Sequence, residues 1–270
     1  MGKILNEIGP KEVEFISSQK VFFVGTAPLA SEHYVSVSPK APGNACVVID
    51  PHTVAYADLT GSGAETAAHV LQNGRMTLMF CNLEDGPPKI LRLSGHAQVL
   101  FPEKNVSHSM LSKFPKEITS SPGFRAVYKL DVTRISTSCG FSLPIMDFKK
   151  FRSTLKEITE KDGKKGISDY ITLKNSFSIH GLPSIGLVRP DAPQNIVPVE
   201  EEGFIFGKVL EGDKTLSIST SNAQLLYRKK QKINLRPFEI IVGALTIFVA
   251  GIVTGLYCAN IFVYDLQKYF

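Results

Sequence analysis

The residues with the clearest chemical potential lie in the segment 54–66, where an apolar run ends in Thr-Gly-Ser-Gly and leads into a helical pattern. Ser62 is placed to cap that helix, and Glu65 follows it by three residues, which is the spacing of a capping box. The first backbone N–H groups of a helix lack internal partners and carry the positive end of its dipole. Gly61 and Gly63 would let a ligand approach the backbone closely. The segment predicts either a capped helix without a ligand or a cradle for a phosphate.

The other reactive side chains form no recognisable catalytic or metal-binding set, and we expect no metal site. The four cysteines show no C-x-x-C spacing, which favours packed thiols in a reducing compartment over a disulfide framework or a zinc site. Cys139 is accordingly expected to pack as a small residue. The six histidines are scattered, and His69, four residues after Glu65, is expected to form a helix-surface pair with it.

The charge distribution argues against binding to nucleic acid. The net charge of +5 arises largely from residues 228–270, where basic residues outnumber acidic ones, so the part before them is nearly neutral. Binding to nucleic-acid phosphates needs positive charge clustered over a face of the domain. We therefore expect a small-molecule substrate, whose identity the sequence does not reveal, and no nucleic-acid partner.

A long apolar segment near residue 270 predicts a membrane anchor. Residues 240–264 are all uncharged, and as a helix they would span about 37 Å, enough to cross a bilayer with some tilt. The basic residues lie before this run, which by the positive-inside rule places the N-terminal domain in the cytosol. We expect a single-pass tail anchor that contacts the lipid bilayer through residues 240–264, in the endoplasmic reticulum rather than the mitochondrial outer membrane.

The pattern along the chain predicts a mainly β domain with several helices. Strands are expected at residues 21–26, 33–38, 46–50, 54–58, 75–81, 89–100 and 126–138. Helices are expected at residues 12–18, 63–73, 102–114 and 146–161, and a hairpin at residues 204–210 with 214–219. We expect four divisions of the chain. Residues 1–188 would form the split-barrel domain and residues 189–236 a loop and hairpin extension with a basic juxtamembrane linker. Residues 237–264 would form a transmembrane helix and residues 265–270 a short tail.

Several segments, in the same order, resemble the pyridoxamine 5′-phosphate oxidase-like family, the FMN-binding split barrels. The matching segments are residues 15–19, 22–28, 37–40, 54–66, 73–81, 88–95, 138–141 and 178–183. The resemblance covers roughly residues 10 to 190 and implies a six-stranded split β-barrel that pairs as a homodimer, with FMN near the dimer interface.

The resemblance also implies which residues hold FMN. Ser38 and Lys40 would come from a strand that lines the cofactor, while the glycine-rich turn would face the phosphate together with a cation, either Lys40 or Arg92. A helix N-terminus with one lysine or arginine is a physically suitable site for a phosphate dianion. The complete set of implied FMN-binding residues is Ser38, Lys40, Thr60, Gly61, Ser62, Gly63, Thr66 and Arg92.

The chain departs from the family pattern at several positions, and alternative roles remain for some residues. Ser36 and Ala41 flank the Ser-Pro-Lys motif where Asn and Gly are usual, and a positive φ at Ala41 would be strained. His180 replaces an Asp in the later motif. Asp58 is expected to support the turn structurally, and Arg92 alternates outward on its strand, so it can be either a ligand contact or a surface charge.

Together these observations predict an FMN-dependent oxidoreductase that is tethered to a membrane. The catalytic residues are unknown, because flavin carries the redox chemistry and the protein positions and tunes it. The alternative is a non-catalytic protein of the same fold, either a cofactor-binding module or a dimeric scaffold.

Overall fold

The computed structural model describes residues 2–210, all of which belong to one unit. The predicted anchor helix, residues 237–264, and the tail, residues 265–270, lie outside the described residues. Within residues 2–210, no helix combines the length and the apolarity that a membrane span requires.

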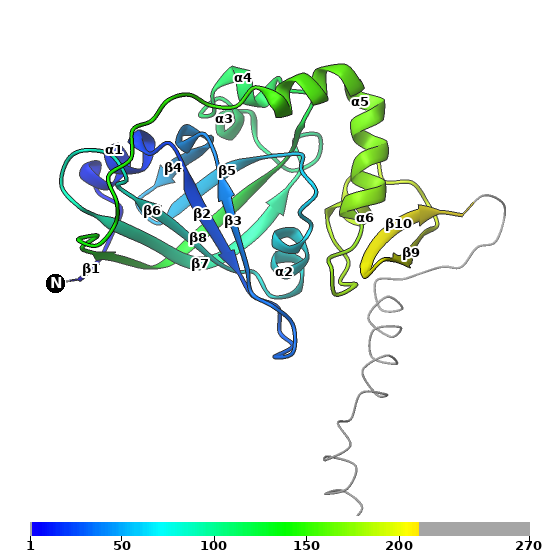
Figure 1. The fold of residues 1–270 in the computed structure, drawn as a ribbon, viewed down its shortest axis with the longest axis horizontal. Coiled ribbons are helices and arrows are strands. Elements are labelled where there is room, and N and C mark those ends of the chain that lie inside the picture. The colour runs from blue at the N-terminus through cyan, green and yellow to red at the C-terminus, as the bar shows by residue number, and fades with distance from the viewer. Residues whose placement is uncertain (1, 211–270) are drawn as a thin grey trace, which may run out of the picture. The chain divides into compact units, whose positions relative to one another are not determined.

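The unit is built around one eight-stranded antiparallel sheet, which confirms the prediction of a mainly β fold (Figure 1). Seven strands follow the order β3-β2-β6-β7-β8-β5-β4, and β1 pairs with β8. Within the described chain, the end strands β3 and β4 do not pair with each other, so the sheet is not a closed barrel, and it has eight strands where the split β-barrel was predicted with six. The strands are β1 (Lys3–Leu5), β2 (Phe22–Thr26), β3 (Ser36–Lys40), β4 (Cys46–Asp50), β5 (Thr53–Leu59), β6 (Arg75–Cys81), β7 (Ile90–Leu100) and β8 (Phe124–Ser138).

The sheet curls because its two longest strands bend where their register shifts. The shift in the pairing of β7 with β8 lies between Ser94 and Gly95. A Cβ atom at Gly95 would collide with the backbone oxygen of Asp131, so only glycine permits this close approach of the two strands. The curvature brings β2 and β3 across β7 and β8 in the view of Figure 1.

The core occupies both faces of β5. Tyr56 is fully buried in the main cluster with Phe22 and Tyr128, inside the curved sheet. Ala55 and its neighbours face a second cluster formed with the short helices α3 (His108–Leu111) and α4 (Lys116–Thr119). The predicted helix 102–114 is therefore wrong in extent, because α3 begins only after its cap Ser107, whose Oγ accepts a hydrogen bond from the Met110 N–H at 3.2 Å.

The longer helices mostly follow the prediction. They are α1 (Pro10–Ser18), α2 (Glu65–Asn73) and α5 (Thr154–Asn175), with α6 (Ile185–Val188) as a single turn, and η1 (Gly43–Ala45) is a short 3-10 turn. Gly74 ends α2 with φ 71°, as the Asn-Gly pair predicts. The helix expected at residues 146–161 begins later, because residues 144–153 have no regular structure, and Met146, Phe148 and Phe151 line a surface cavity instead of packing in the core.

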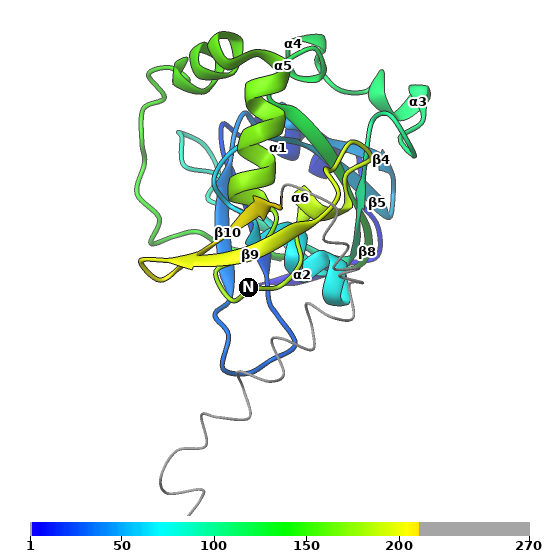
Figure 2. The same cartoon turned by 90° about the vertical axis from the view of Figure 1, so that its right-hand side faces the viewer.

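A two-stranded hairpin, β9 (Ile196–Glu201) with β10 (Phe204–Val209), packs against α5 (Figure 2). The strand predicted at residues 204–210 is confirmed, but its partner is the preceding strand, through a turn at Glu202 and Gly203, both of positive φ. The other predicted partner, residues 214–219, lies outside the described residues. The hairpin and α5 stand beside the end of β5 where the glycine-rich turn begins.

Candidate functional site

The glycine-rich turn leaves β5 and enters α2 in a different way from the one predicted. Helix α2 begins at Glu65 with Ala64 as its N-cap, so Ser62 lies outside the helix and the predicted capping box is wrong. The Oε2 atom of Glu65 instead accepts a hydrogen bond from the Ala64 N–H at 3.0 Å. The N–H of the N-cap residue, the first donor at this end of the helix, is therefore already hydrogen-bonded to a carboxylate of the chain itself.

Arg125 and Asn175 hold the turn through its carbonyl groups. Arg125 donates from Nη1 to the Gly61 oxygen and from Nη2 to the Gly63 oxygen, both at 3.2 Å. Asn175 donates from Nδ2 to the oxygens of Gly61 at 2.9 Å and Ser62 at 3.3 Å. Within residues 2–210, the N–H groups of these three turn residues have no hydrogen-bond partner. The turn thus directs its acceptors inward and leaves three backbone donors free.

A buried ion cluster of Asp58, Arg125 and Lys40 lies next to the turn, and Arg125 connects the two through its hydrogen bonds. The Asp58 side chain is 1% exposed and accepts from Arg125 Nε at 2.6 Å and from Lys40 Nζ at 3.1 Å. Burial would raise the pKa of Asp58, but the charges of Arg125 and Lys40 outweigh it and lower that pKa below its ordinary value. Burial likewise opposes the charge of Arg125, and Asp58 raises the arginine pKa. Two cations and one anion leave the cluster with a net positive charge beneath the turn.

Ser38 and Lys40 lie on one face of edge strand β3. Ser38 is paired with Val24 and Lys40 with Phe22, and both partners are fully buried. Paired residues on antiparallel strands point to the same side of a sheet, so Ser38 and Lys40 face inward. The Lys40–Asp58 contact bridges β3 and β5, which are not neighbours in the sheet. The structure therefore places Lys40 beside Asp58, two residues before the turn begins at Thr60. Ser38 lies two residues from Lys40 on the same face of β3.

Arg92 lies on the other face of the sheet. Its neighbours Leu91 and Leu93 are fully buried on the inner face, so Arg92 points outward, as its alternation predicts. Its Nη1 donates to Ser138 Oγ at 3.0 Å. The structure does not bring Arg92 together with the turn, and of the two predicted cations only Lys40 is near it.

Thr60 and Thr66, at the two ends of the turn, have their side chains directed into the protein. Thr60 donates both its N–H, at 2.7 Å, and its Oγ1, at 2.9 Å, to the Gly123 oxygen. Thr66 is 8% exposed, which leaves little of its side chain accessible to a ligand. Thr60 therefore fixes the turn to the start of β8, and the accessible donors are the backbone groups between the two threonines.

The exposed side of the turn opens on a cavity of about 390 Å³. Ser62, Gly63 and Glu65 form one wall, and the other walls come from the end of α5, the segment after it and β10. Lys174 places its Nζ 4.0 Å from the centroid of the Phe206 ring there. This lysine is a cation at the turn that the sequence analysis missed.

Two side chains differ from their predicted environments. His69 is fully buried rather than paired on the helix surface, and its Nδ1 lies 3.0 Å from Thr26 Oγ1. Burial lowers the pKa of His69, with Glu65 opposing that shift and His180 adding to it. Cys139, expected to be packed, is exposed and free. Both predictions failed because sequence spacing does not show which face of an element is covered by a distant segment.

The other residues missed from the sequence are Arg125 and Asn175. Arg125 precedes the predicted strand 126–138, and Asn175 ends a helix whose place was mispredicted, so no local motif pointed to either. The strain considered at Ala41 does not arise, because the residues of positive φ other than glycine in the described chain are Asn195 and Glu202.

Comparison with known proteins places the chain in a family. A family profile described as pyridoxamine 5′-phosphate oxidase matches residues 8–139. The pyridoxamine 5′-phosphate oxidase family protein ustO of Aspergillus flavus is 35% identical over 181 residues, which are 62% of this chain and 71% of that protein.

Solved structures give weaker matches. HupZ of Group A Streptococcus is 19% identical over 47% of this chain and 91% of its own, with a TM-score of 0.37. A pyridoxamine 5′-phosphate oxidase-related protein of Lactobacillus delbrueckii is 18% identical over 49% of this chain and 98% of its own, with a TM-score of 0.36. The assignment rests on the two sequence matches, which show that this chain belongs to the pyridoxamine 5′-phosphate oxidase family.

Proposed function

We propose that the protein is a flavin-dependent oxidoreductase that binds FMN at the glycine-rich turn. The observation that carries this proposal is the free set of backbone donors at Gly61, Ser62 and Gly63 above a buried cluster of net positive charge. Family membership supports the choice of a flavin. Backbone N–H groups beside fixed positive charge suit a phosphate, and the residues present therefore fit the phosphate end of FMN.

Each residue of the site has a separate task in this proposal. Arg125 and Asn175 hold the carbonyl groups inward, so that the free N–H groups of the turn can donate to the phosphate. Lys40 and Lys174 contribute positive charge, while Glu65 opposes the anion and limits its affinity. Bound flavin would supply hydride or electron transfer. The substrate would be a small molecule.

The test is flavin binding by the full chain purified in mild detergent. We expect a flavin absorbance spectrum or, after removal of any bound flavin, saturable quenching of FMN fluorescence. Lys40→Met should weaken FMN binding, whereas Lys129→Met should not. Lys129 also forms an ion pair, with Asp131 at an N–O distance of 2.7 Å, but this pair is not at the turn. A colourless protein that leaves FMN fluorescence unchanged would refute the proposal and favour a scaffold without cofactor.

We also propose a homodimer that pairs through the region of β3. The connection before β3 and the strand itself expose large apolar side chains, including Tyr34 at 73% and Val37 at 65%. An exposed apolar edge strand is an interaction surface. Light scattering should give twice the mass of one chain, and Val37→Lys should shift it to the monomer. A wild-type monomer at micromolar concentration would contradict this.

Membrane anchoring is proposed from sequence, because residues 240–264 lie outside the described chain. We expect the protein to resist carbonate extraction from membranes of the endoplasmic reticulum and to become extractable when residues 237–270 are deleted. The N-terminal domain should face the cytosol, so the Asn105-Val-Ser107 sequon should carry no glycan. Glycosylation at Asn105 would show that the N-terminal domain faces the lumen and would contradict the proposed orientation.

A further inference from the structure

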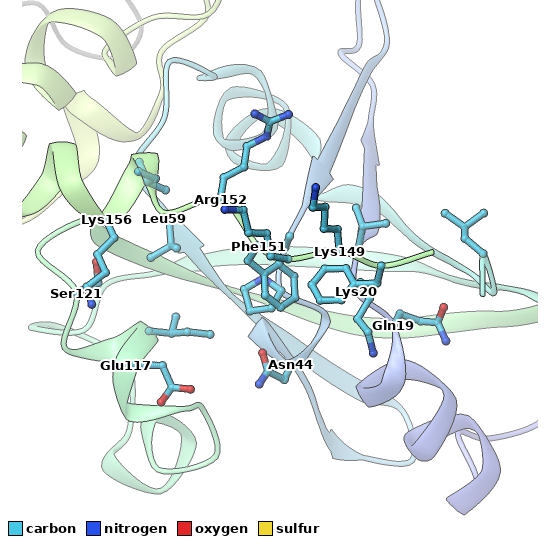
Figure 3. Close-up of a pocket in the computed structure, with 18 of the residues that line it drawn as sticks. Gln19, Lys20, Asn44, Leu59, Glu117, Ser121, Lys149, Phe151, Arg152 and Lys156 are labelled. Atoms are coloured by element: carbon cyan, nitrogen blue, oxygen red, sulfur yellow. The ribbon is translucent and has the colours of Figure 1, made fainter. Parts of the chain in front are cut away.

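A second and larger cavity, of about 1030 Å³, lies beneath the irregular segment before α5 (Figure 3). Its walls come from residues 19–21, 41, 42 and 44, the ends of β5 and β6, helix α4 and residues 146–152, 155 and 156. None of the eight residues assigned to FMN lines it, although Leu59 and Ala41 in its wall adjoin Thr60 and Lys40 along the chain. We call it the segment cavity.

One part of the segment cavity is apolar. Leu59, Cys81 and Ile118 provide a wall that the sheet and α4 hold in place. From the irregular segment come Phe148 and Phe151, whose ring centroids are 4.7 Å apart. Phe151 is nevertheless 48% exposed, so an aromatic surface remains open to water. An apolar ligand in the cavity would cover that surface.

Some of the charged residues around the cavity form ion pairs and others do not. Two of its acidic residues form ion pairs. Glu84 pairs with Lys20 at 3.6 Å, and Glu160 pairs with Lys156, four residues before it on α5, at 3.8 Å. Among the described residues, Lys149, Lys150 and Arg152 form no ion pair. Two acidic residues, Asp147 and Glu117, also line the cavity without an ion pair. In Figure 3 the charged ends of Lys149 and Arg152 extend in the same direction, and Glu117 lies on the opposite side of Phe151.

We propose that the segment cavity binds an amphipathic anion, a molecule with an apolar body and one anionic head group. The body would cover Phe148 and Phe151, and the head would contact the unpaired cations at positions 149, 150 and 152. A cavity that combines an apolar wall with polar groups that orient the ligand is a usual form of a small-molecule site. The three unpaired cations on the segment that covers the site favour an anionic head group over a cationic one, against the two unpaired carboxylates of Asp147 and Glu117. The proposal does not depend on flavin binding.

Two dyes with the same apolar body provide the test. Anilinonaphthalene sulfonate carries an anionic head, and N-phenylnaphthylamine lacks it. Both are titrated by fluorescence into the full chain in one fixed detergent, with the signal of the detergent alone subtracted. The wild type should bind the sulfonate saturably and more tightly than the neutral dye.

The variants separate the charge from the apolar wall. K149Q/K150Q/R152Q should weaken binding of the sulfonate about tenfold, the loss expected for a charge-assisted contact, and leave the neutral dye unchanged. Phe151→Ala should weaken both dyes. The matched controls are K164Q/K165Q, an adjacent lysine pair on α5 outside the cavity, and Phe141→Ala, an exposed aromatic outside it. All the substituted side chains are exposed, so the variants should fold, and circular dichroism checks this.

Several results would overturn the proposal. Equal loss of both dyes in the triple variant would show that the cations do not recognise the head group. Unsaturable binding that no variant changes would mean adsorption of dye to the surface. Displacement of the sulfonate by FMN would place flavin in this cavity, and dissociation of a dimer by the dye would make the cavity an interface between copies. Failure of FMN binding alone would refute the proposed function and leave this proposal intact.

Discussion

Replacement of Asp58 by Asn should be among the most destabilising single changes in the chain. The substitution keeps the shape of the side chain and removes its charge. Arg125, whose side chain is 6% exposed, would then be a buried cation without an anionic partner. Removing one member of a buried ion pair costs about 3 to 5 kcal/mol of unfolding free energy, because the other charge remains desolvated.

The expected loss lies near the lower limit, at about 3 kcal/mol. Arg125 keeps three neutral acceptors, the oxygens of Gly61 and Gly63 and the side chain of Asn175. Lys40→Met provides the comparison, because it removes a partner that is 24% exposed and makes one contact with Asp58. That loss should be about 1 kcal/mol, close to the value for a partly exposed pair.

Urea unfolding of the full chain, followed by circular dichroism, measures both losses. The pKa of Asp58 is lower in the folded than in the unfolded chain, so its contribution is complete above the unfolded value of about 3.8 and is lost as pH falls through the folded pKa. The difference between wild type and Asp58→Asn should be constant from about pH 7 to 5 and shrink below about pH 4. Equal losses for Asp58→Asn and Lys40→Met, or a difference that persists at low pH, would refute this account of the cluster.

Three further predictions concern α2. Glu65→Gln removes a negative charge at the turn and should tighten FMN binding about two- to fivefold in a fluorescence titration. An unchanged FMN affinity would show that Glu65 does not oppose the anion. His69→Gln should flatten the fall in stability between about pH 7 and 5, because burial lowers the pKa of His69 in the folded chain and the unfolded chain gains the proton first as pH falls through its ordinary pKa of about 6.5. Gly74→Ala should lower the unfolding free energy by about 1 kcal/mol, since φ is 71° and the new Cβ would lie 3.3 Å from the Ala97 oxygen; an unchanged urea midpoint would contradict it.

Several strands were predictable because local turn signals bound them, whereas β1 and β9 were not predicted and the strand predicted at residues 33–38 lies at Ser36–Lys40. The predicted strands 46–50, 75–81 and 89–100 agree with β4, β6 and β7 within one residue. The predicted helix at residues 146–161 failed for a physical reason. Phe148 and Phe151 have helical spacing, but they line the segment cavity, and spacing alone does not show whether a core surface is present to receive them.

The candidate site was predictable only where one segment contained it. The turn from Gly61 to Gly63 was identified from its own composition, and Lys40 from a resemblance. Arg125 is 64 residues from Gly61 and Asn175 is 114 residues from it, and both donate to that carbonyl. No sequence pattern encodes such contacts, because they depend on how the sheet and α5 pack. The same limit explains why Arg92 was grouped with the turn although it lies on the opposite face.

The turn depends on both the family-matched part of the chain and the part that follows it. Residues 8–139 supply Lys40, Asp58 and Arg125, whereas Asn175 comes from beyond that match. Beyond it too, Ser184 Oγ donates to the Ala64 oxygen at 2.6 Å, and the Ile179 N–H donates to Glu65 Oε1 at 3.3 Å. These contacts fix the N-cap and the carboxylate that, in the proposed function, opposes an anion. If the turn binds an anion as proposed, changes in the segment 175–184 should alter its affinity, and relatives that differ in that segment should differ in anion affinity even when their turns are identical.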